Sequence, residues 1–284
     1  MARVLLIVFL MLLSQISSAQ NSRLRILTEN WPPVTYEKSG APQGMAVELT
    51  QLLQKRMNSN DLIEVVPWPR GYELVKTKPN VLLFTMTRTP EREKLFTLLG
   101  PIANGEIALY TRRSFPTEFH TLDEIREKFT IGVHRGTVFQ KTLEEYDFKN
   151  IVPVNSPISN LKMLMAGRVD FICEDALVIK ELLKEAGYPA DASQKAFSLL
   201  KKSSLYFAFS RGTPKETVEK WQRAFTDVKK NGEFKTLHQK WFGNHPAPMD
   251  VVVINPPDEF VFPETPVRKS LSAGLLKFLF PDSE

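Results

Sequence analysis

Cysteine is almost absent from the sequence: Cys173 is the only one in 284 residues, so the chain has no intramolecular disulfide. Cys173 ends an apolar run beside Ile172 and Glu174, which is typical of a small buried side chain rather than a nucleophile. With 43% hydrophobic and 24% charged residues, the composition is ordinary for a soluble globular protein. The core can therefore be substantial without covalent cross-links.

Signatures of catalysis and of metal or nucleic-acid binding are also missing. The four histidines lack a metal-binding spacing, and no nucleophile-elbow or phosphate-loop pattern occurs. Lysine and arginine are dispersed, without a long basic run. We therefore expect no metal, no cofactor and no nucleic-acid partner. The histidines are His120, His134, His238 and His245.

Long apolar runs are confined to residues 4–13, which follow Arg3 and precede the small residues Ser17, Ser18 and Ala19. This pattern predicts a secretory signal peptide over residues 1–19, cleaved so that the mature chain begins at Gln20. An uncleaved anchor is the alternative, although the run is short for a membrane span. The product is expected to be exported and soluble.

Apolar runs alternate with helical patterns along the rest of the chain. Strands are predicted at 24–27, 62–66 and 81–84, with a helix at 44–57. After Pro101 the alternation restarts, and further strands are predicted at 106–111, 130–133, 151–154, 169–173 and 205–209. The sequence thus predicts an α/β protein with mostly parallel sheets, helices on both faces, and a second, smaller α/β unit.

The stretch from Thr85 to Arg92 follows the apolar strand at 81–84 and leads into a predicted helical turn. Ligands collect at the carboxyl ends of strands in α/β sheets. The hydroxyls of Thr85 and Thr87 and the planar guanidinium of Arg92 therefore predict a small cradle for an anionic group. A surface salt bridge between Arg92 and a neighbouring glutamate is the alternative.

Other strand ends carry candidate side chains. Trp31 lies on a proline-stiffened loop, where it could stack on a ligand or plug the edge of the domain. Trp68 occupies a similar loop, and His134 and Thr137 follow the strand at 130–133. Asp175 follows the strand at 169–173, where it could also cap a helix.

An ordered series of motifs resembles the bacterial extracellular solute-binding proteins of family 3, the periplasmic receptors for polar amino acids. The resemblance covers residues 24–243. Its markers are the aromatic-proline loop after the first strand, the helix at 44–57, and a Thr-x-Thr-x-x-Arg pattern. The later markers are Gly136-Thr137, Gly167-Arg168-Val169-Asp170, Asn231-Gly232 and Lys240-Trp241-Phe242-Gly243.

The resemblance implies a periplasmic-binding-protein fold of type II, with two α/β lobes joined by a two-strand hinge. Lobe 1 would comprise residues 20–101 and 206–243, and lobe 2 residues 106–201. The hinge would lie at 102–105 and 202–205. The implied function is capture of a zwitterionic or carboxylate solute by lobe closure in the periplasm. The implied partner is a membrane transporter permease or receptor, and the protein is expected to be a monomer.

The resemblance also implies roles for single residues. Arg92 would grip the α-carboxylate of an amino acid, with hydrogen bonds from Thr85, Thr87 and Thr137. Asp175 would hold the α-ammonium. Trp31 and Trp68 would wall the side chain, and His134 would face the variable end of the ligand. Phe84 and Thr85 replace a small residue and glycine of the family pattern, so the pocket floor is expected to be tight.

Two other functions share the implied fold. A few such proteins are dehydratases acting on cyclohexadienyl substrates, in which Glu174 or Asp175 could serve as the acid. A ligand-sensing partner of a membrane receptor is the other alternative. The segment 244–284 lies outside the family pattern and includes a predicted short helix at 268–280. It is expected either to pack on the body or to contact a partner or a membrane surface.

Overall fold

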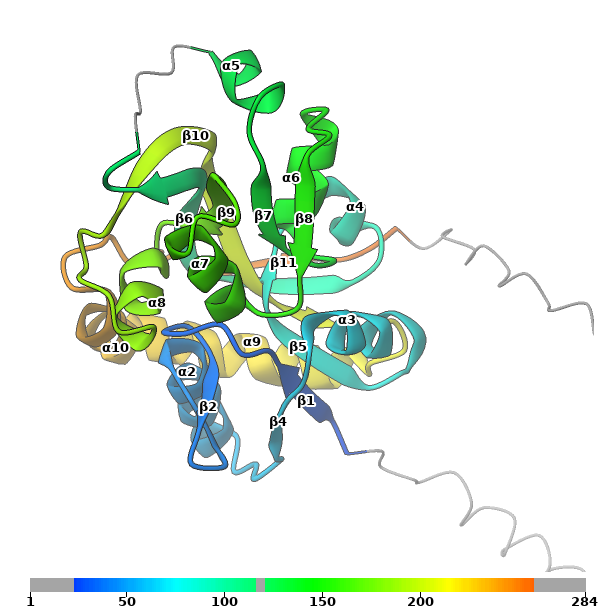
Figure 1. Ribbon diagram of the computed structural model, residues 1–284. Coiled ribbons are helices and arrows are strands. Elements are labelled where there is room, and N and C mark those ends of the chain that lie inside the picture. Colours follow the sequence, from blue (N-terminus) through cyan, green and yellow to red (C-terminus); the bar gives the residue numbers. More distant parts are fainter. Residues whose placement is uncertain (1–22, 116–120, 258–284) are drawn as a thin grey trace, which may run out of the picture.

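A computed structural model describes residues 23–115 and 121–257 (Figure 1). The predicted signal peptide and the predicted helix at 268–280 lie outside the described residues. Within them, a nine-stranded sheet has the order β4-β1-β5-β10-β6-β9-β7-β8, with β11 added to β6, and β2 and β3 form a separate hairpin. The strands are β1 (Arg25–Thr28), β2 (Tyr36–Lys38), β3 (Ala41–Gln43), β4 (Ile63–Val65), β5 (Val81–Thr87), β6 (Thr97–Arg112), β7 (Ile131–His134), β8 (Ile151–Val154), β9 (Phe171–Asp175), β10 (Ser193–Phe209) and β11 (Val252–Ile254).

The sheet contains two parallel groups of strands. One group joins β4, β1 and β5, and the other joins β8, β7 and β9. Between them, β10 pairs antiparallel with β5 and β6, and β6 pairs antiparallel with β9. The sheet is therefore mixed rather than mostly parallel. We call the group around β1 and its helices lobe 1, and the group around β7 and its helices lobe 2. Lobe 1 is the lower half of Figure 1, and lobe 2 is the upper half.

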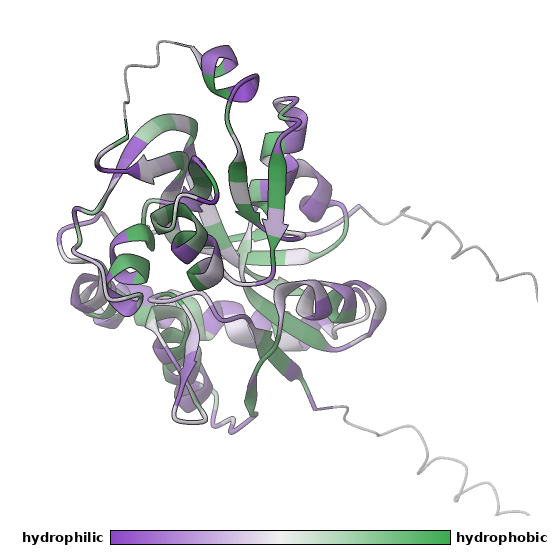
Figure 2. Cartoon of the chain, in the orientation of Figure 1, coloured by the Kyte–Doolittle hydropathy of each residue, from purple (hydrophilic) through white to green (hydrophobic). Residues whose placement is uncertain are grey.

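Helices cover the faces of both groups. In lobe 1, α2 packs against α9 and α10, and α3 packs on β5; in lobe 2, α6 and α7 pack on β7. Figure 2 shows hydrophobic strands at the centre and hydrophilic residues on the outer sides of the helices. The helices are α2 (Met45–Arg56), α3 (Trp68–Thr77), α4 (Pro90–Glu93), α5 (Leu122–Arg126), α6 (Val138–Glu145), α7 (Pro157–Met165), α8 (Ile179–Glu185), α9 (Lys215–Lys230) and α10 (Glu233–Phe242).

The two lobes are joined by β6 and β10, which are far longer than the strands predicted at 106–111 and 205–209. From the sequence, Gly100, Pro101 and Gly105 suggest that a strand is interrupted here, yet β6 continues through all three. Its pairing with β10 shifts register at four places, so the long ribbon is irregular where it passes between the lobes. The hinge positions 102–105 and 202–205 lie inside these strands, and the exact lobe boundaries stay a prediction.

The described part of the C-terminal segment packs on lobe 1. Strand β11 pairs antiparallel with β6 from Leu98 to Gly100. The buried Lys229 ammonium donates hydrogen bonds to the carbonyls of Pro101 (2.8 Å) and Asp250 (2.6 Å). Burial lowers the pKa of Lys229 to about 7, while Asp250 opposes that shift. Residues 244–257 thus belong to the body of the protein rather than to a free tail. Within the described ranges, no helix has the length and apolar character needed to cross a bilayer.

Candidate functional site

A small cavity lies between the two lobes, where β1, β5 and β7 end. Its volume is about 20 Å³, which is the space of about one water molecule. Seven of the eight predicted site residues line it, and Asp175 does not. Their role in binding stays a prediction, although the structure brings them together. The lining residues are Glu29, Trp31, Trp68, Thr85, Thr87, Arg92, His134, Thr137, Val138 and Phe139.

Thr85 reaches the cavity through a β-bulge. On β5, Phe84 pairs with Phe207 and Met86 pairs with Tyr206, so Thr85 is the extra residue between two consecutive partners. Its φ is +68°, a left-handed conformation that is unusual for a β-branched residue, and its hydroxyl donates to the carbonyl of Phe84 (2.6 Å). Such local strain is concentrated at functional sites. The predicted helical turn after the strand is only the four residues of α4.

Arg92 is held rigidly at the cavity wall. Thr89 caps α4 by accepting a hydrogen bond from the backbone N–H of Arg92 (3.2 Å). The guanidinium donates to the carbonyl of Thr87 (2.8 Å) and lies 5.2 Å from the Trp68 ring centroid and 5.4 Å from that of Tyr72. Only 6% of the residue is exposed, which excludes the surface salt bridge considered from the sequence. Burial lowers the Arg92 pKa, while Tyr72 and Glu29 raise it.

Glu29 supplies an acidic group to the same cavity, and sequence reasoning missed it. Burial raises its pKa to about 8, although Arg92 opposes the shift. Its Oε2 atom is buried without a hydrogen-bond partner and lies 3.6 Å from His134 Nδ1. Burial lowers the His134 pKa to about 4, so near pH 7 both groups are predominantly neutral and their contact is not an ion pair. Glu29 thus offers a carboxyl oxygen to which no described residue makes a hydrogen bond.

Two tryptophans connect the lobes through their indole N–H groups. Trp31 of lobe 1 donates to Glu174 of lobe 2 (3.1 Å), and Trp68 of lobe 1 donates to the carbonyl of Gly136 of lobe 2 (2.8 Å). The Trp31 ring also lies 6.0 Å from the Phe139 ring. Both tryptophans are nearly fully buried, so they wall the cavity and bridge its two sides at once.

Asp175 lies at the hinge instead of the cavity. Its Oδ1 accepts a hydrogen bond from the Leu177 N–H (2.9 Å) and its Oδ2 accepts one from the Ser203 hydroxyl (2.7 Å). A Cβ atom at Gly105 would lie 2.1 Å from Oδ1, so only glycine lets the carboxyl pack against β6 there. Burial raises the Asp175 pKa to about 6. The expectation that Asp175 faces the ligand is therefore not supported by its position.

The reason is the strand periodicity. Glu174 and Asp175 are consecutive residues of β9, and consecutive side chains of a strand point to opposite faces. Glu174 faces Trp31 and the cleft, whereas Asp175 faces the hinge. Burial raises the Glu174 pKa to about 8, while hydrogen bonds from Asp175 N–H and Trp31 lower it.

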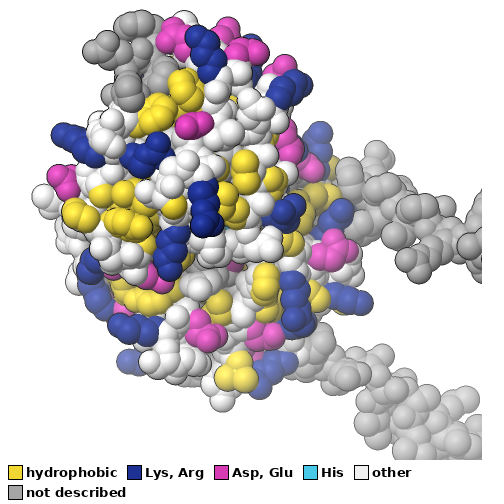
Figure 3. Space-filling view, viewed as in Figure 1, with side chains coloured by type: hydrophobic (Ala, Val, Ile, Leu, Met, Phe, Trp, Pro, Cys, Tyr) yellow, Lys and Arg dark blue, Asp and Glu magenta, His cyan; other side chains and the backbone are white. Residues whose placement is uncertain are grey.

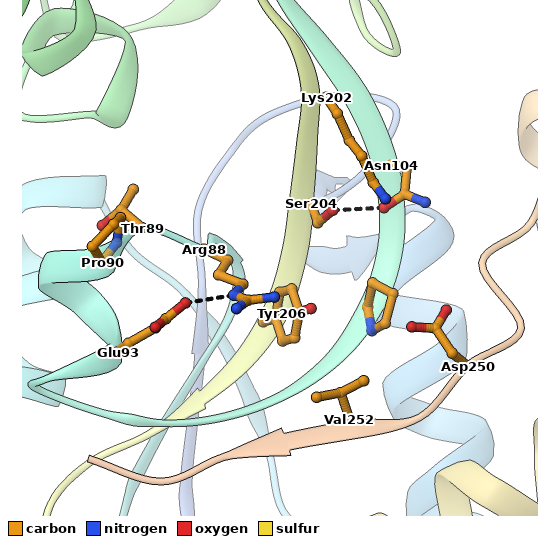
Figure 4. A pocket seen from close by; sticks show the side chains of 11 residues that line it. Arg88, Thr89, Pro90, Glu93, Asn104, Lys202, Ser204, Tyr206, Asp250 and Val252 are labelled. Carbon is orange, nitrogen blue, oxygen red and sulfur yellow. Dashed lines mark hydrogen bonds and ion pairs between the residues drawn. The ribbon is translucent and has the colours of Figure 1, made fainter. Parts of the chain in front are cut away.

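A larger hollow of about 370 Å³ lies on the outer side of the hinge, where the C-terminal segment around Asp250 and Val252 meets β6 and β10 (Figure 4). Arg88 is paired there with Glu93, and the Ser204 hydroxyl donates to Asn104 (2.7 Å). None of the predicted site residues lines this hollow. Size alone therefore does not identify the site, because Arg92 and Glu29, a buried pair of oppositely ionisable groups, lie at the small cavity.

The visible surface offers no single dominant charge. In Figure 3, lysine and arginine side chains are interspersed with aspartate and glutamate. Among the described residues, no group of three or more histidine, cysteine, aspartate or glutamate side chains is arranged to hold a metal ion. The cavity is thus the feature that combines buried charge, aromatic walls and residues from both lobes.

Two α/β lobes connected by two long strands, with a cavity at their interface, define a binding protein of the periplasmic type. The sequence profile of the bacterial extracellular solute-binding proteins, family 3, matches residues 24–244. The chain therefore belongs to this family, and it is a solute-binding protein of the type II fold.

Curated relatives are distant but cover most of the chain. The putative ABC transporter arginine-binding protein 2 of Escherichia coli (strain K12) is 26% identical over 233 residues, covering 80% of this chain and 93% of the relative. The L-cystine-binding protein TcyJ of the same organism is 22% identical over 220 residues, covering 76% and 81%. The sensor domain of a histidine kinase with similarity to periplasmic binding proteins matches with a TM-score of 0.72 at 18% identity, covering 81% of this chain and 100% of that domain.

Proposed function

We propose that the protein binds a small zwitterion, an α-amino acid, between its lobes without transforming it. The observation that carries this proposal is the pair of buried, oppositely ionisable groups at one cavity, Arg92 and Glu29. A guanidinium matches a carboxylate with two parallel hydrogen bonds. The unpartnered Glu29 oxygen is suited to an ammonium. Relatives named for arginine and cystine binding support this ligand class.

In this assignment Glu29 takes the role that the sequence suggested for Asp175. Both Asp175 oxygens already accept hydrogen bonds that fix the turn after β9 and the hinge. Replacing those bonds with a ligand would leave the Leu177 N–H and the Ser203 hydroxyl without partners, which is costly for buried groups. Asp175 is therefore a structural residue of the hinge in our proposal.

Closure follows from contacts that exist only when the lobes meet. A cavity of about 20 Å³ cannot admit an amino acid, so the ligand enters when the lobes are apart. Lobe 2 then brings His134, Thr137 and Phe139 over the ligand, and the indoles of Trp31 and Trp68 bond across the interface. The ligand favours the closed form because only that form offers both walls.

The position of the carboxyls favours binding over dehydration. An acid catalyst must reach the substrate. Neither Glu174 nor Asp175 lines the cavity, and both are engaged in hydrogen bonds within the protein. Incubation of the purified protein with prephenate tests this directly: we expect no turnover, and a steady, enzyme-dependent loss of prephenate would overturn the proposal.

We further propose that the protein is secreted through the signal at residues 1–19, works as a monomer and presents its ligand to a membrane transporter. The role with a transporter is supported by a relative whose name describes it as a putative ABC transporter arginine-binding protein. Mass spectrometry of the exported protein should give an N-terminus at Gln20, and light scattering should give the mass of one chain.

A thermal-shift screen against the twenty amino acids and small carboxylates tests the ligand class. A ligand that binds only the native state raises the melting temperature with concentration. We expect at least one zwitterionic amino acid to raise it and the matched ester, which lacks the carboxylate, to leave it unchanged. Equal shifts for the acid and its ester would refute recognition of the carboxylate.

A further inference from the structure

A second hollow lies directly outside the cavity, at the mouth of the cleft. Its volume is about 300 Å³, and it shares the wall residues Arg92, Thr137 and Val138 with the inner cavity. Both lobes build it, because Tyr72 comes from α3 of lobe 1 and Gln140 from α6 of lobe 2. We call this space, lined by residues 72, 89, 91, 92, 136–138, 140, 141 and 144, the outer subsite.

The volumes decide in which direction a ligand extends. Arg92 stands at the junction of the two spaces, and Glu29 lies only in the inner one. The inner space has room for about one water, so a carboxylate on Arg92 with its ammonium toward Glu29 fits only with the lobes slightly further apart than here, and it leaves no inner space for a side chain. The remainder of the molecule then has to pass outward, between Thr137 and Tyr72.

The outer subsite carries charges of both signs. Glu91 of lobe 1 and Lys141 of lobe 2 form an ion pair across the mouth, and their side chains are 55% and 48% exposed. Glu144 is nearby on α6, where it accepts a hydrogen bond from Gln140 (2.8 Å). An exposed ion pair contributes little to stability, so a ligand can separate its members at small cost.

Resting on the amino-acid binding proposed above, we infer that the outer subsite receives the far end of an extended ligand and selects one that carries both an ammonium and a carboxylate there. Glu91 and Lys141 are the residues that read this second head group. They exchange their mutual ion pair for one contact each with the ligand. A ligand with an uncharged far end offers no partner to either residue. Glu91 and Lys141 would then keep their ion pair around the ligand, or lose it without gaining another contact.

Calorimetry on the full chain tests the inference with long ligands that differ at the far end, and with alanine, which has no far end. The probes are L-alanine, L-norleucine, L-lysine, L-α-aminoadipate and meso-diaminopimelate. We expect diaminopimelate to bind about tenfold more tightly than norleucine, with lysine and aminoadipate between them. Glu91→Gln and Lys141→Gln should each remove about threefold of that preference while leaving the affinity for alanine unchanged.

The matched controls are Glu93→Gln, in the same helical turn, and Lys149→Gln, an exposed lysine of lobe 2; neither lines the outer subsite, and both should keep the full preference. A preference that survives in Glu91→Gln and Lys141→Gln would overturn the inference. Equal weakening of alanine and diaminopimelate would also overturn it, because the pair would then act only as a latch between the lobes. If wild type binds alanine and Arg92→Ala does not, the proposed function stands whichever way the far-end preference falls. If no probe binds, both proposals fail.

Discussion

The two walls of the cleft differ in kind. Lobe 1 provides the ionisable pair Arg92 and Glu29, each fixed at the end of a strand or in the short helix that follows. Lobe 2 provides Thr137, Val138, Phe139 and a histidine whose pKa is lowered to about 4 by burial, so that it is neutral near pH 7. In our proposal, recognition of the α-carboxylate and the α-ammonium therefore belongs to lobe 1, and lobe 2 excludes water from these contacts and completes the hydrogen bonds.

This difference changes how closure is explained. The sequence suggested that opposite charges on facing lobes, Arg92 and Asp175, would draw the lobes together. With Asp175 at the hinge, the ligand can satisfy both of its charges on lobe 1 while the cleft is still open. Closure then gains from burial of the aromatic walls and from the two indole bonds, and it strengthens the charged contacts by removing water. The predictions below separate these two contributions.

The largest effect is expected for Arg92→Ala. Hydrogen bonds to charged groups contribute about 1.5–3 kcal/mol each, and a guanidinium makes two with a carboxylate. We therefore expect calorimetry to show an affinity at least about 100-fold weaker. Arg88→Ala is the control, since Arg88 lies four residues away, pairs with Glu93 and does not line the cavity. An unchanged affinity in Arg92→Ala would assign the carboxylate to another residue.

Glu29 should make binding dependent on pH. Burial raises its pKa to about 8 in the closed, empty cavity, whereas a bound ammonium would keep it ionised. To the extent that the free protein populates this closed, empty form, binding below pH 8 releases a proton, and affinity should rise with pH between pH 6 and 8 by at most about tenfold per pH unit. Glu29→Gln should be weaker and nearly independent of pH. Calorimetry in buffers of different ionisation enthalpy measures the released proton directly; zero release at pH 7 would contradict the assignment.

A smaller effect is expected from the lobe-2 contacts. Trp68→Phe keeps an aromatic ring beside Arg92 but loses the hydrogen bond to the Gly136 carbonyl. One neutral hydrogen bond contributes about 0.5–1.5 kcal/mol, so affinity should fall roughly twofold to tenfold, mainly through faster dissociation. Stopped-flow kinetics measures both rates. Trp241→Phe, on α10 and outside the cavity, should change neither rate.

The last prediction concerns stability rather than binding. The Glu174 pKa is raised from 4.5 to about 8, so the folded state holds a proton that the unfolded state releases between those values. The resulting stabilisation is fully present below pH 4.5 and is lost as pH rises through 8. Urea unfolding at several pH values should therefore show a decline in the free energy of unfolding that Glu174→Gln reduces and the exposed Glu216→Gln does not. If the free energy of unfolding declines as steeply with pH in Glu174→Gln as in wild type, groups other than Glu174 cause the decline.

Much of the site could be predicted because carboxyl ends of strands meet at one edge of a sheet. Thr87, Arg92, His134 and Thr137 were found by that rule and line one cavity. The same rule could have found Glu29, which directly follows β1, a parallel neighbour of β5. A single glutamate after a strand looks like an ordinary surface residue, and only its burial distinguishes it.

Other features depend on three-dimensional contacts that no local pattern contains. Thr85 adopts a positive φ because the pairing of β5 with β10 requires a bulge there. The sequence could not tell which of Glu174 and Asp175 faces the cleft, since that depends on where β9 ends. The length of β6 was hidden by Gly100 and Pro101, which favour a break locally but are accommodated by pairing with β10 and β11.

The central claim is that charges on lobe 1 hold the ligand, and that contacts of the held ligand with lobe 2 shift the lobes toward the closed form. Distance measurement between labels at Lys55→Cys on lobe 1 and Lys149→Cys on lobe 2 tests it, because Cys173 is buried and burial raises its thiol pKa. A ligand concentration that saturates wild type should shorten the distance in wild type and in Arg88→Ala, and leave it unchanged in Arg92→Ala. The same shortening in Arg92→Ala would contradict the account.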